Sequence, residues 1–270
     1  MSDIGDDWAL YAGHRARFSA ELSACAPVNG WRLCILGAGK CNDVDLERLA
    51  EVFSEIHLVD IDPPAVASAV ARQSAEVRAR LRLHVPVDLA GLTAKRLGKW
   101  QRKPPTRAEL EQLETSTLAA VVARLPGPFD VVASACILTQ LSFAVRQALG
   151  ERSPALSAVR FSVMLTHLRS LLALTRVGGT SLFASDVVSS STHPLLSELP
   201  ADADLGGVLN EVSAAGNVYF AANPKLIRDA LTYDAVMAEQ VGALTQLPPW
   251  LWSGPLGRIY LVYGLRLARA

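Results

Sequence analysis

The residues best suited to chemistry lie in a glycine turn, Leu36-Gly-Ala-Gly-Lys-Cys-Asn-Asp43, which follows a short apolar run. Such a turn lets the backbone approach a ligand closely, and the N-terminus of the helix that follows favours anionic groups. Asp60 ends the next apolar run, 23 residues after Gly37. An acid at that position can accept hydrogen bonds from both hydroxyl groups of a ribose. Together these features predict a site for a cofactor that contains a nucleoside.

Alternating strands and helices would position these residues. Apolar runs predict strands over residues 31–36, 55–60, 82–87, 129–135, 180–187 and 258–267, with residues 236–241 as a candidate strand before the last one. Apolar residues at helical spacing predict helices over residues 7–26, 43–53, 63–77, 110–122 and 161–172, the last of which ends at Gly178-Gly179. The alternation predicts a parallel sheet with helices on both faces, to which the final two strands add an antiparallel hairpin.

Composition and charge exclude several classes of protein. Half of the 270 residues are hydrophobic and 19% are charged, whereas a disordered chain is poor in apolar residues and rich in charge of one sign. Lys and Arg total 26 and Asp and Glu total 26, so the formal net charge is zero. Charge therefore gives no general argument for a nucleic-acid or membrane partner.

The sequence also predicts a cytoplasmic protein without a metal site. Residues 1–8 carry Asp3, Asp6 and Asp7 and no basic residue, which is not the pattern of a secretory signal. The longest weakly polar run, residues 131–145, is too short and too polar to span a bilayer. The four cysteines form no C-x-x-C pair, so we expect reduced thiols and no bound zinc.

The glycine turn begins a series of blocks that resembles the class I S-adenosylmethionine-dependent methyltransferases. A dinucleotide fingerprint has its third glycine where this chain has Asn42. The blocks run in order through residues 31–187. They are the turn, Asp60 in V-D-I-D-P, Asp88 in P-V-D-L, Phe129–Leu138 in F-D-V-V-x-S-x-x-x-L, and Gly178–Leu182 in G-G-T-S-L.

This resemblance implies a fold, a cofactor and a set of cofactor residues. The fold is a Rossmann-like three-layer α/β sandwich with a seven-stranded, mostly parallel sheet and an antiparallel C-terminal strand. Residues 1–28 would form an N-terminal helical lid, and residues 29–270 a methyltransferase domain with an insertion at about 188–223. The cofactor is S-adenosylmethionine and the product S-adenosylhomocysteine. The residues assigned to the cofactor are Gly37, Ala38, Gly39, Asn42, Asp43, Asp60, Ile61, Asp88, Leu89, Ser134 and Ala135.

Two residues depart from the family pattern. Ile35 stands where an acid is usual, two residues before the first glycine, and Cys41 stands where the third glycine of G-x-G-x-G is usual. We therefore expect Asn42 and Asp43 to supply polar contacts to the amino-acid end of the cofactor. The alternative is that Asn42 or Asp43 caps the following helix, and both roles can coexist.

The fourth strand favours a small-molecule acceptor. It ends in Ser134-Ala-Cys-Ile-Leu-Thr-Gln-Leu141 and lacks the N/D-P-P-Y/F motif of enzymes that methylate exocyclic amines of bases or glutamine. Thr139 and Gln140 take the places where small-molecule methyltransferases often carry histidines. They are candidates for substrate binding, together with Tyr11 and Arg15 of the leading helix.

No general base is evident in this sequence. The candidates for a catalytic group are Asp186 near the end of the fifth strand, His193 in the long connection that follows, and Gln140. His167 is expected to be structural. Trp250 and Trp252 are expected to anchor a turn rather than to bind a ligand.

Three alternatives to small-molecule methyl transfer stay open. The basic segment 95–107 surrounds Trp100 with cations and no acid, a pattern that could bind RNA or another nucleic acid. A solvated loop at residues 101–106 between two helices is the simpler interpretation. The chain could instead be an NAD(P)-binding oxidoreductase or a non-catalytic nucleoside-binding module. The sequence leaves the oligomeric state and the methylated atom open.

Overall fold

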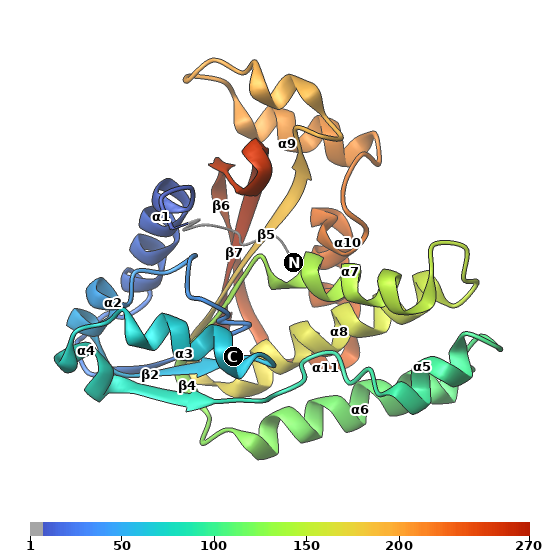
Figure 1. The fold of residues 1–270 in the computed structure, drawn as a ribbon, viewed down its shortest axis with the longest axis horizontal. Coiled ribbons are helices and arrows are strands. Elements are labelled where there is room, and N and C mark those ends of the chain that lie inside the picture. The colour runs from blue at the N-terminus through green and yellow to red at the C-terminus, as the bar shows by residue number, and fades with distance from the viewer. Residues whose placement is uncertain (1–7) are drawn as a thin grey trace.

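A seven-stranded sheet forms the middle layer of the protein (Figure 1). The computed structural model describes residues 8–270, so Asp3, Asp6 and Asp7 lie outside the described residues. The strands are β1 (Trp31–Leu36), β2 (Phe53–Val59), β3 (Leu81–His84), β4 (Phe129–Ala135), β5 (Thr175–Ser189), β6 (Val241–Ser253) and β7 (Ile259–Arg269). Their order is β3-β2-β1-β4-β5-β7-β6, with β1 to β5 parallel and β7 antiparallel to both of its neighbours. This order confirms the predicted fold class.

Helices cover both faces of the sheet. One face carries α1 (Ala12–Ser23), α2 (Leu46–Val52), α3 (Pro63–Ala71) and α4 (Ala75–Arg80). The other carries α6 (Arg107–Arg124), α7 (Ile137–Leu149), α8 (Leu156–Leu174), α10 (Pro224–Tyr233) and α11 (Ala235–Ala238). In Figure 1, α5 (Ala94–Trp100) lies beside α6 at the right, and α9 (Leu205–Ala214) lies above the sheet.

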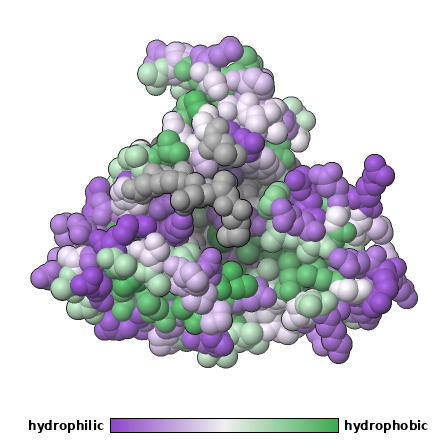
Figure 2. All heavy atoms as spheres, in the orientation of Figure 1, coloured by the Kyte–Doolittle hydropathy of each residue, from purple (hydrophilic) through white to green (hydrophobic). Residues whose placement is uncertain are grey.

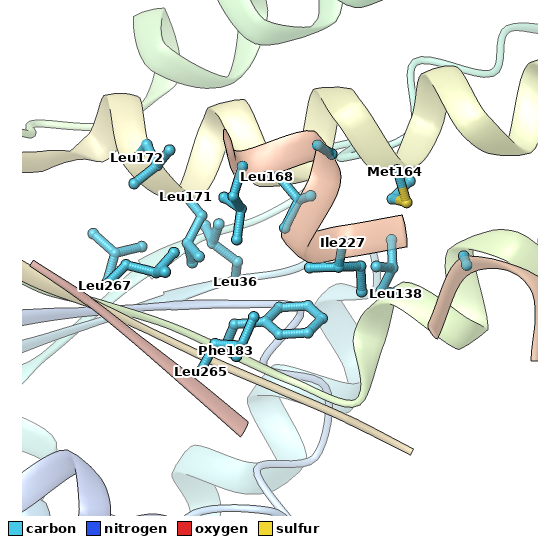
Figure 3. Packing of buried hydrophobic residues seen from close by; sticks show 14 of the residues in the cluster. Leu36, Leu138, Met164, Leu168, Leu171, Leu172, Phe183, Ile227, Leu265 and Leu267 are labelled. Atoms are coloured by element: carbon cyan, nitrogen blue, oxygen red, sulfur yellow. The ribbon is translucent and has the colours of Figure 1, made fainter. Parts of the chain in front are cut away.

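Burial on both sides of the central strands explains their continuous apolar runs. Leu33 and Ile35 of β1 belong to the core that packs against α1 to α4, whereas Cys34 and Leu36 belong to the core on the α8 side. Phe183 of β5 also lies in the core on the α8 side, beneath α8 (Figure 3). Strands that are covered on both faces need no polar alternation, so their sequences read as unbroken hydrophobic segments.

The prediction of a strand over residues 236–241 is wrong. Asp234 begins the short helix α11 there, because its carboxylate accepts hydrogen bonds from the backbone N–H groups of Val236 and Met237. The strand that pairs with β7 begins only at Val241. A local helix cap thus decides the structure of a segment whose apolar content also suits a strand.

Several helix boundaries also differ from prediction. The helix predicted over residues 63–77 is divided into α3 and α4, because the side chain of Ser74 caps α4 by accepting from the N–H of Val77. The helix before β5 ends at Leu174 rather than at Gly178-Gly179, and those glycines lie inside β5.

The connection between β5 and β6 folds into helices of its own. It contains the short 3-10 helices η1 (Pro194–Ser197) and η2 (Phe220–Ala222) in addition to α9, α10 and α11. Leu196, Leu209 and Ile227 anchor it in the core on the α8 side. Within residues 8–270, none of the helices combines the length and hydrophobicity that crossing a lipid bilayer requires.

Candidate functional site

The glycine turn lies where the strand order reverses direction. The chain moves from β1 outward to β3 and then returns to place β4 on the other side of β1. Ligands of open α/β sheets bind outside the carboxyl ends of the strands at this point. The turn after β1, Asp60 after β2, Asp88 after β3 and the residues that follow β4 and β5 therefore share one edge of the sheet.

The backbone of the turn is left-handed at three alternate residues. Gly37, Gly39 and Cys41 have φ values of +73°, +49° and +54°. A Cβ atom on Gly37 would lie 2.4 Å from Cγ1 of Ile137, so this position requires glycine for space as well as for conformation. Cys41, which stands where a third glycine was expected, has the same left-handed backbone conformation as the two glycines.

Asp60 is held in place by the turn. Its Oδ2 accepts a hydrogen bond of 2.8 Å from the N–H of Gly39, and its Oδ1 accepts one of 2.8 Å from the N–H of Asp62. The residue is only 8% exposed. A carboxylate has about four acceptor sites, so both oxygens keep capacity for a further donor. The carboxylate is therefore fixed in orientation and can accept further hydrogen bonds, for example from two adjacent hydroxyl groups.

A cavity of about 300 Å³, the first cavity, lies beside Asp60. It is largely apolar, with the carboxylates of Asp60 and Asp88 as its charged groups, as is typical of small-molecule and cofactor sites. Asp88 is fixed because its Oδ1 accepts from the N–H groups of Ala90 and Gly91. The lining residues are Gly37, Asp60, Ile61, Val87, Asp88, Leu89, Ala90, Leu92, Leu97, Ile137, Leu141, Ala144 and Ala148.

Helix α7 separates this cavity from a second one. Ile137, Leu141, Ala144 and Ala148 recur at helical spacing and line the first cavity. A different stripe of the same helix lines the second cavity, which has a volume of about 610 Å³. The residues around the second cavity are Thr139, Gln140, Ser142, Phe143, Arg146, Arg160, Asp186, Ser191, Thr192, Tyr219, Phe220, Arg258 and Tyr260. It thus brings together the predicted substrate residues Thr139 and Gln140 with the predicted catalytic candidate Asp186.

Asp186 has the most unusual environment of these residues. It is 7% exposed, and its Oδ1 accepts a hydrogen bond of 2.6 Å from the hydroxyl of Thr139. Burial raises the pKa of this carboxyl from its ordinary 3.8 to about 6, against the hydrogen bond from Thr139, which lowers it. The pairing of β5 with β7 shifts register between Asp186 and Val188, and such bulges redirect side chains beside functional sites.

Helix α1 is attached directly to the glycine turn. The guanidinium of Arg15 donates to the carbonyl of Asn42 over 3.1 Å, and the hydroxyl of Ser19 accepts from the N–H of Asp45 over 2.8 Å. The side chain of Asp45, not Asn42 or Asp43, caps α2 by accepting from the N–H of Arg48. The alternative role of Asn42 or Asp43 as the helix cap is therefore wrong.

His14 links Asp43 to the far edge of the sheet. The indole N–H of Trp250 donates to Nδ1 of His14 over 3.1 Å, and Nε2 of His14 lies 3.1 Å from Oδ1 of Asp43. An indole can only donate, so Nδ1 must be unprotonated and the ring proton must lie on Nε2, which faces Asp43. Trp250 and Trp252 are buried in β6 rather than at a turn, and the ring of Trp252 lies 4.7 Å from that of Tyr11.

Nine of the predicted site residues line neither cavity: Tyr11, Arg15, Ala38, Gly39, Asn42, Asp43, Ser134, Ala135 and His193. Ser134 is fully buried, and its hydroxyl lies 2.7 Å from Nε2 of His167 in α8, so its side chain points into the core on that face. His167 has the structural position expected of it, and burial lowers its pKa to about 4. His193 precedes η1 and does not line the second cavity, although its neighbours Ser191 and Thr192 do.

The basic segment forms the end of α5, a loop at residues 101–106, and the start of α6, as the simpler interpretation predicts. Figure 2 shows hydrophilic residues gathered at this end of the molecule. Trp100 is only 2% exposed, so its ring is not available to stack on a base. The segment also borders a cavity of about 680 Å³, where Lys99 pairs with Glu109 and the guanidinium of Arg96 donates to the carbonyl of Gly91.

Several solved structures are similar to this protein in fold, although they share little of its sequence. The YcgJ protein from Bacillus subtilis is 9% identical, and the alignment covers 94% of this chain and 98% of that chain with a TM-score of 0.51. The protein shares the fold of that structure, with a seven-stranded sheet between two layers of helices. Magnesium protoporphyrin IX methyltransferase from Synechocystis PCC 6803, solved with bound SAH, is 14% identical over 100% of this chain and 89% of that chain, with a TM-score of 0.47. The N-methyltransferase NodS from Bradyrhizobium japonicum is 14% identical over 99% of both chains, with a TM-score of 0.45.

Sequence comparison gives no closer relationship. No protein-family model matches the chain, and no curated protein matches it. At the identities found, the likeness to solved structures concerns the fold alone.

The hydrogen bond between Ser134 and His167 yields a prediction. Ser134→Ala removes a buried partner from His167, whose Nδ1 has no hydrogen-bond partner within residues 8–270, so we expect a loss of about 1–3 kcal/mol in the free energy of unfolding. The affinity for S-adenosylhomocysteine should stay within twofold. Urea denaturation and calorimetry measure the two effects. A variant of unchanged stability that binds the ligand tenfold more weakly would instead assign the Ser134 hydroxyl to the cofactor.

Proposed function

We propose that this protein is an S-adenosylmethionine-dependent methyltransferase that acts on a small molecule bound in the second cavity. The observation that carries the proposal is Asp60. This buried carboxylate is oriented by two backbone N–H groups and opens onto an apolar cavity at the point where the strand order reverses. The two cavities on either side of α7 suit a cofactor and an acceptor.

The described residues fit the cofactor. Asp60 would hold the ribose hydroxyls, while Asp88 and the backbone near Leu89 would hold the adenine in the first cavity. Gly37 and Gly39 would let the chain approach the amino-acid end, and Asp43 would accept from its ammonium group. When bound, S-adenosylmethionine supplies an electrophilic methyl group. The N-terminal segment that includes α1 would cover this end of the site, as the contacts of Arg15 and His14 to the turn suggest.

The residues of the second cavity would align the acceptor and remove its proton. Asp186 is the candidate base, because a carboxyl with a pKa near 6 is mostly ionised at neutral pH and still accepts a proton readily. The acceptor's lone pair would form the new bond to the methyl carbon while the carbon–sulfur bond breaks and its electron pair stays on sulfur. The proton on the attacking atom would pass to the Asp186 carboxylate. Orientation of this kind can offset roughly 7–11 kcal/mol of a barrier. Thr139 would keep the carboxylate pointed at the acceptor through its hydrogen bond.

Calorimetry with S-adenosylmethionine, S-adenosylhomocysteine and NADH tests the choice of cofactor. We expect the first two to bind with similar affinity and NADH not to bind. Asp60→Asn should weaken S-adenosylhomocysteine binding about 10- to 100-fold, because a charge-assisted hydrogen bond contributes about 1.5–3 kcal/mol. Asp202→Asn is the matched control, since this exposed carboxyl in the insertion should leave the affinity unchanged. Binding of NADH in place of both ligands would contradict the proposal.

A separate calorimetric test addresses Asp43. If its carboxylate holds the ammonium group of the cofactor, Asp43→Ala should weaken S-adenosylhomocysteine binding at least tenfold. Adenosine lacks the amino-acid end, so its affinity should not change. An unchanged affinity for S-adenosylhomocysteine would remove Asp43 from the cofactor site.

The pH dependence of activity and stability tests Asp186. Methyl transfer, followed with a radiolabelled methyl group and an acceptor that the protein uses, should rise as the pH increases through about 6. Asp186→Asn should lower the rate about 10²–10⁴-fold and abolish this rise.

Because the pKa of Asp186 is raised in the folded protein, the stability associated with this group is present below pH 3.8 and lost as the pH rises through about 6. The variant should therefore be more stable at pH 8, by up to about 3 kcal/mol. A variant with full activity would contradict the assignment.

A further inference from the structure

Three arginines line the second cavity, and their partners differ. Arg146, Arg160 and Arg258 come from α7, from α8 and from the residue before β7. Arg146 is neutralised, because its guanidinium donates to the carboxylate of Glu151 over 2.7 Å. Within residues 8–270, neither Arg160 nor Arg258 forms an ion pair.

Arg160 is partly buried in the wall of the cavity. Its Nε donates to the carbonyl of Ser142 over 3.2 Å, and its guanidinium lies 5.2 Å from the centre of the Phe220 ring. Burial, followed by the charge of Arg146, lowers the pKa of Arg160. The Nε contact and the ring fix the plane of the guanidinium while its terminal nitrogens keep donors for a ligand.

Arg258 lies beside the polar side chains of the same cavity. Burial raises the pKa of the Tyr219 hydroxyl, whereas the positive charge of Arg258 lowers it. Tyr219 is itself fixed, because its hydroxyl donates to that of Ser189 over 2.7 Å. Arg258 thus lines the cavity within electrostatic range of the Tyr219 hydroxyl.

Arg160 and Arg258 are half-buried and have no ion-pair partner within residues 8–270, so an anionic group that enters the cavity could pair with both. The planar guanidinium has donors in the geometry that carboxylates and phosphates accept. Aromatic rings in the wall, Phe220 and Tyr260, offer contact area to an apolar body. The cavity therefore combines a preference for negative charge with a surface for a flat or apolar group.

We propose that the methyl acceptor is an anionic small molecule, whose carboxylate or phosphate group binds Arg160 and Arg258 while its apolar body lies against Phe220 and Tyr260. The inference rests on the proposed function, since it names the substrate class of the same site. The arginines would place the anionic group away from the Asp186 carboxylate, because like charges repel, and so would direct the reacting atom toward it.

The test uses calorimetry on protein saturated with S-adenosylhomocysteine. The titrated ligands are small aryl carboxylates, each compared with its primary amide, and phenyl phosphate as a second anion. The amide keeps the shape of the carboxylate and removes its charge. We expect carboxylates to bind at least tenfold more tightly than their amides in calorimetry. Arg160→Gln and Arg258→Gln should each weaken carboxylate binding about 10- to 100-fold and leave amide binding unchanged.

Arg152→Gln is the control, because Arg152 is exposed in the loop between α7 and α8 and does not line the cavity. It should bind carboxylates as the unmodified protein does.

Equal binding of amides and carboxylates, or no binding of any anion, would overturn the inference even if both variants failed to fold. A parallel loss of S-adenosylhomocysteine affinity in both variants would overturn it too, because the arginines would then bind the cofactor's carboxylate. Failure of S-adenosylhomocysteine to bind the unmodified protein would instead count against the proposed function.

Discussion

The hydrogen bond from the N–H of Gly39 to the Asp60 carboxylate is the interaction on which the site depends. It joins the carboxyl ends of β1 and β2, which are neighbours in the sheet but separated along the chain by α2. The turn can place that N–H correctly only because Gly37, Gly39 and Cys41 adopt left-handed backbone conformations. The carboxylate also lines the first cavity, so one contact connects the backbone of the turn to the wall of the proposed cofactor site.

Helix α7 adds the second constraint. Its apolar stripe, which includes Ile137 and Leu141, lines the first cavity, and its polar stripe, which includes Thr139 and Gln140, lines the second. Ile137 also fills the space that a side chain on Gly37 would need. The helix is therefore fixed against the glycine turn, and this contact sets how the two cavities lie relative to each other. A cofactor in one and an acceptor in the other would meet near its first turn.

Much of the fold could be predicted from local patterns. The runs at residues 31–36 and 129–135 match β1 and β4 because strands buried on both faces are continuously apolar. Local patterns failed where a cap decides the outcome, as Asp234 does at α11 and Ser74 at α4. Asp45 likewise caps α2, so Asp43 was left for the contact with His14, which lies in a helix that precedes β1.

The site was only partly predictable, because much of it depends on contacts between distant segments. Asp60 follows a strand at a recognisable spacing, whereas Arg160 and Arg258 meet at one cavity from positions 98 residues apart. Spacing also cannot indicate that Ser134 turns toward His167. The β-bulge beside Asp186 arises from pairing with β7, which is made much later in the chain.

A crystal structure of the protein with S-adenosylhomocysteine tests the central claim most directly, namely that a nucleoside cofactor binds at the Asp60 edge of the sheet. The predicted result places the ribose hydroxyls on the Asp60 carboxylate, the adenine in the first cavity beside Asp88, and the sulfur toward the second cavity. A ligand bound elsewhere, or bound with its carboxylate on Arg160 and Arg258, would contradict this arrangement.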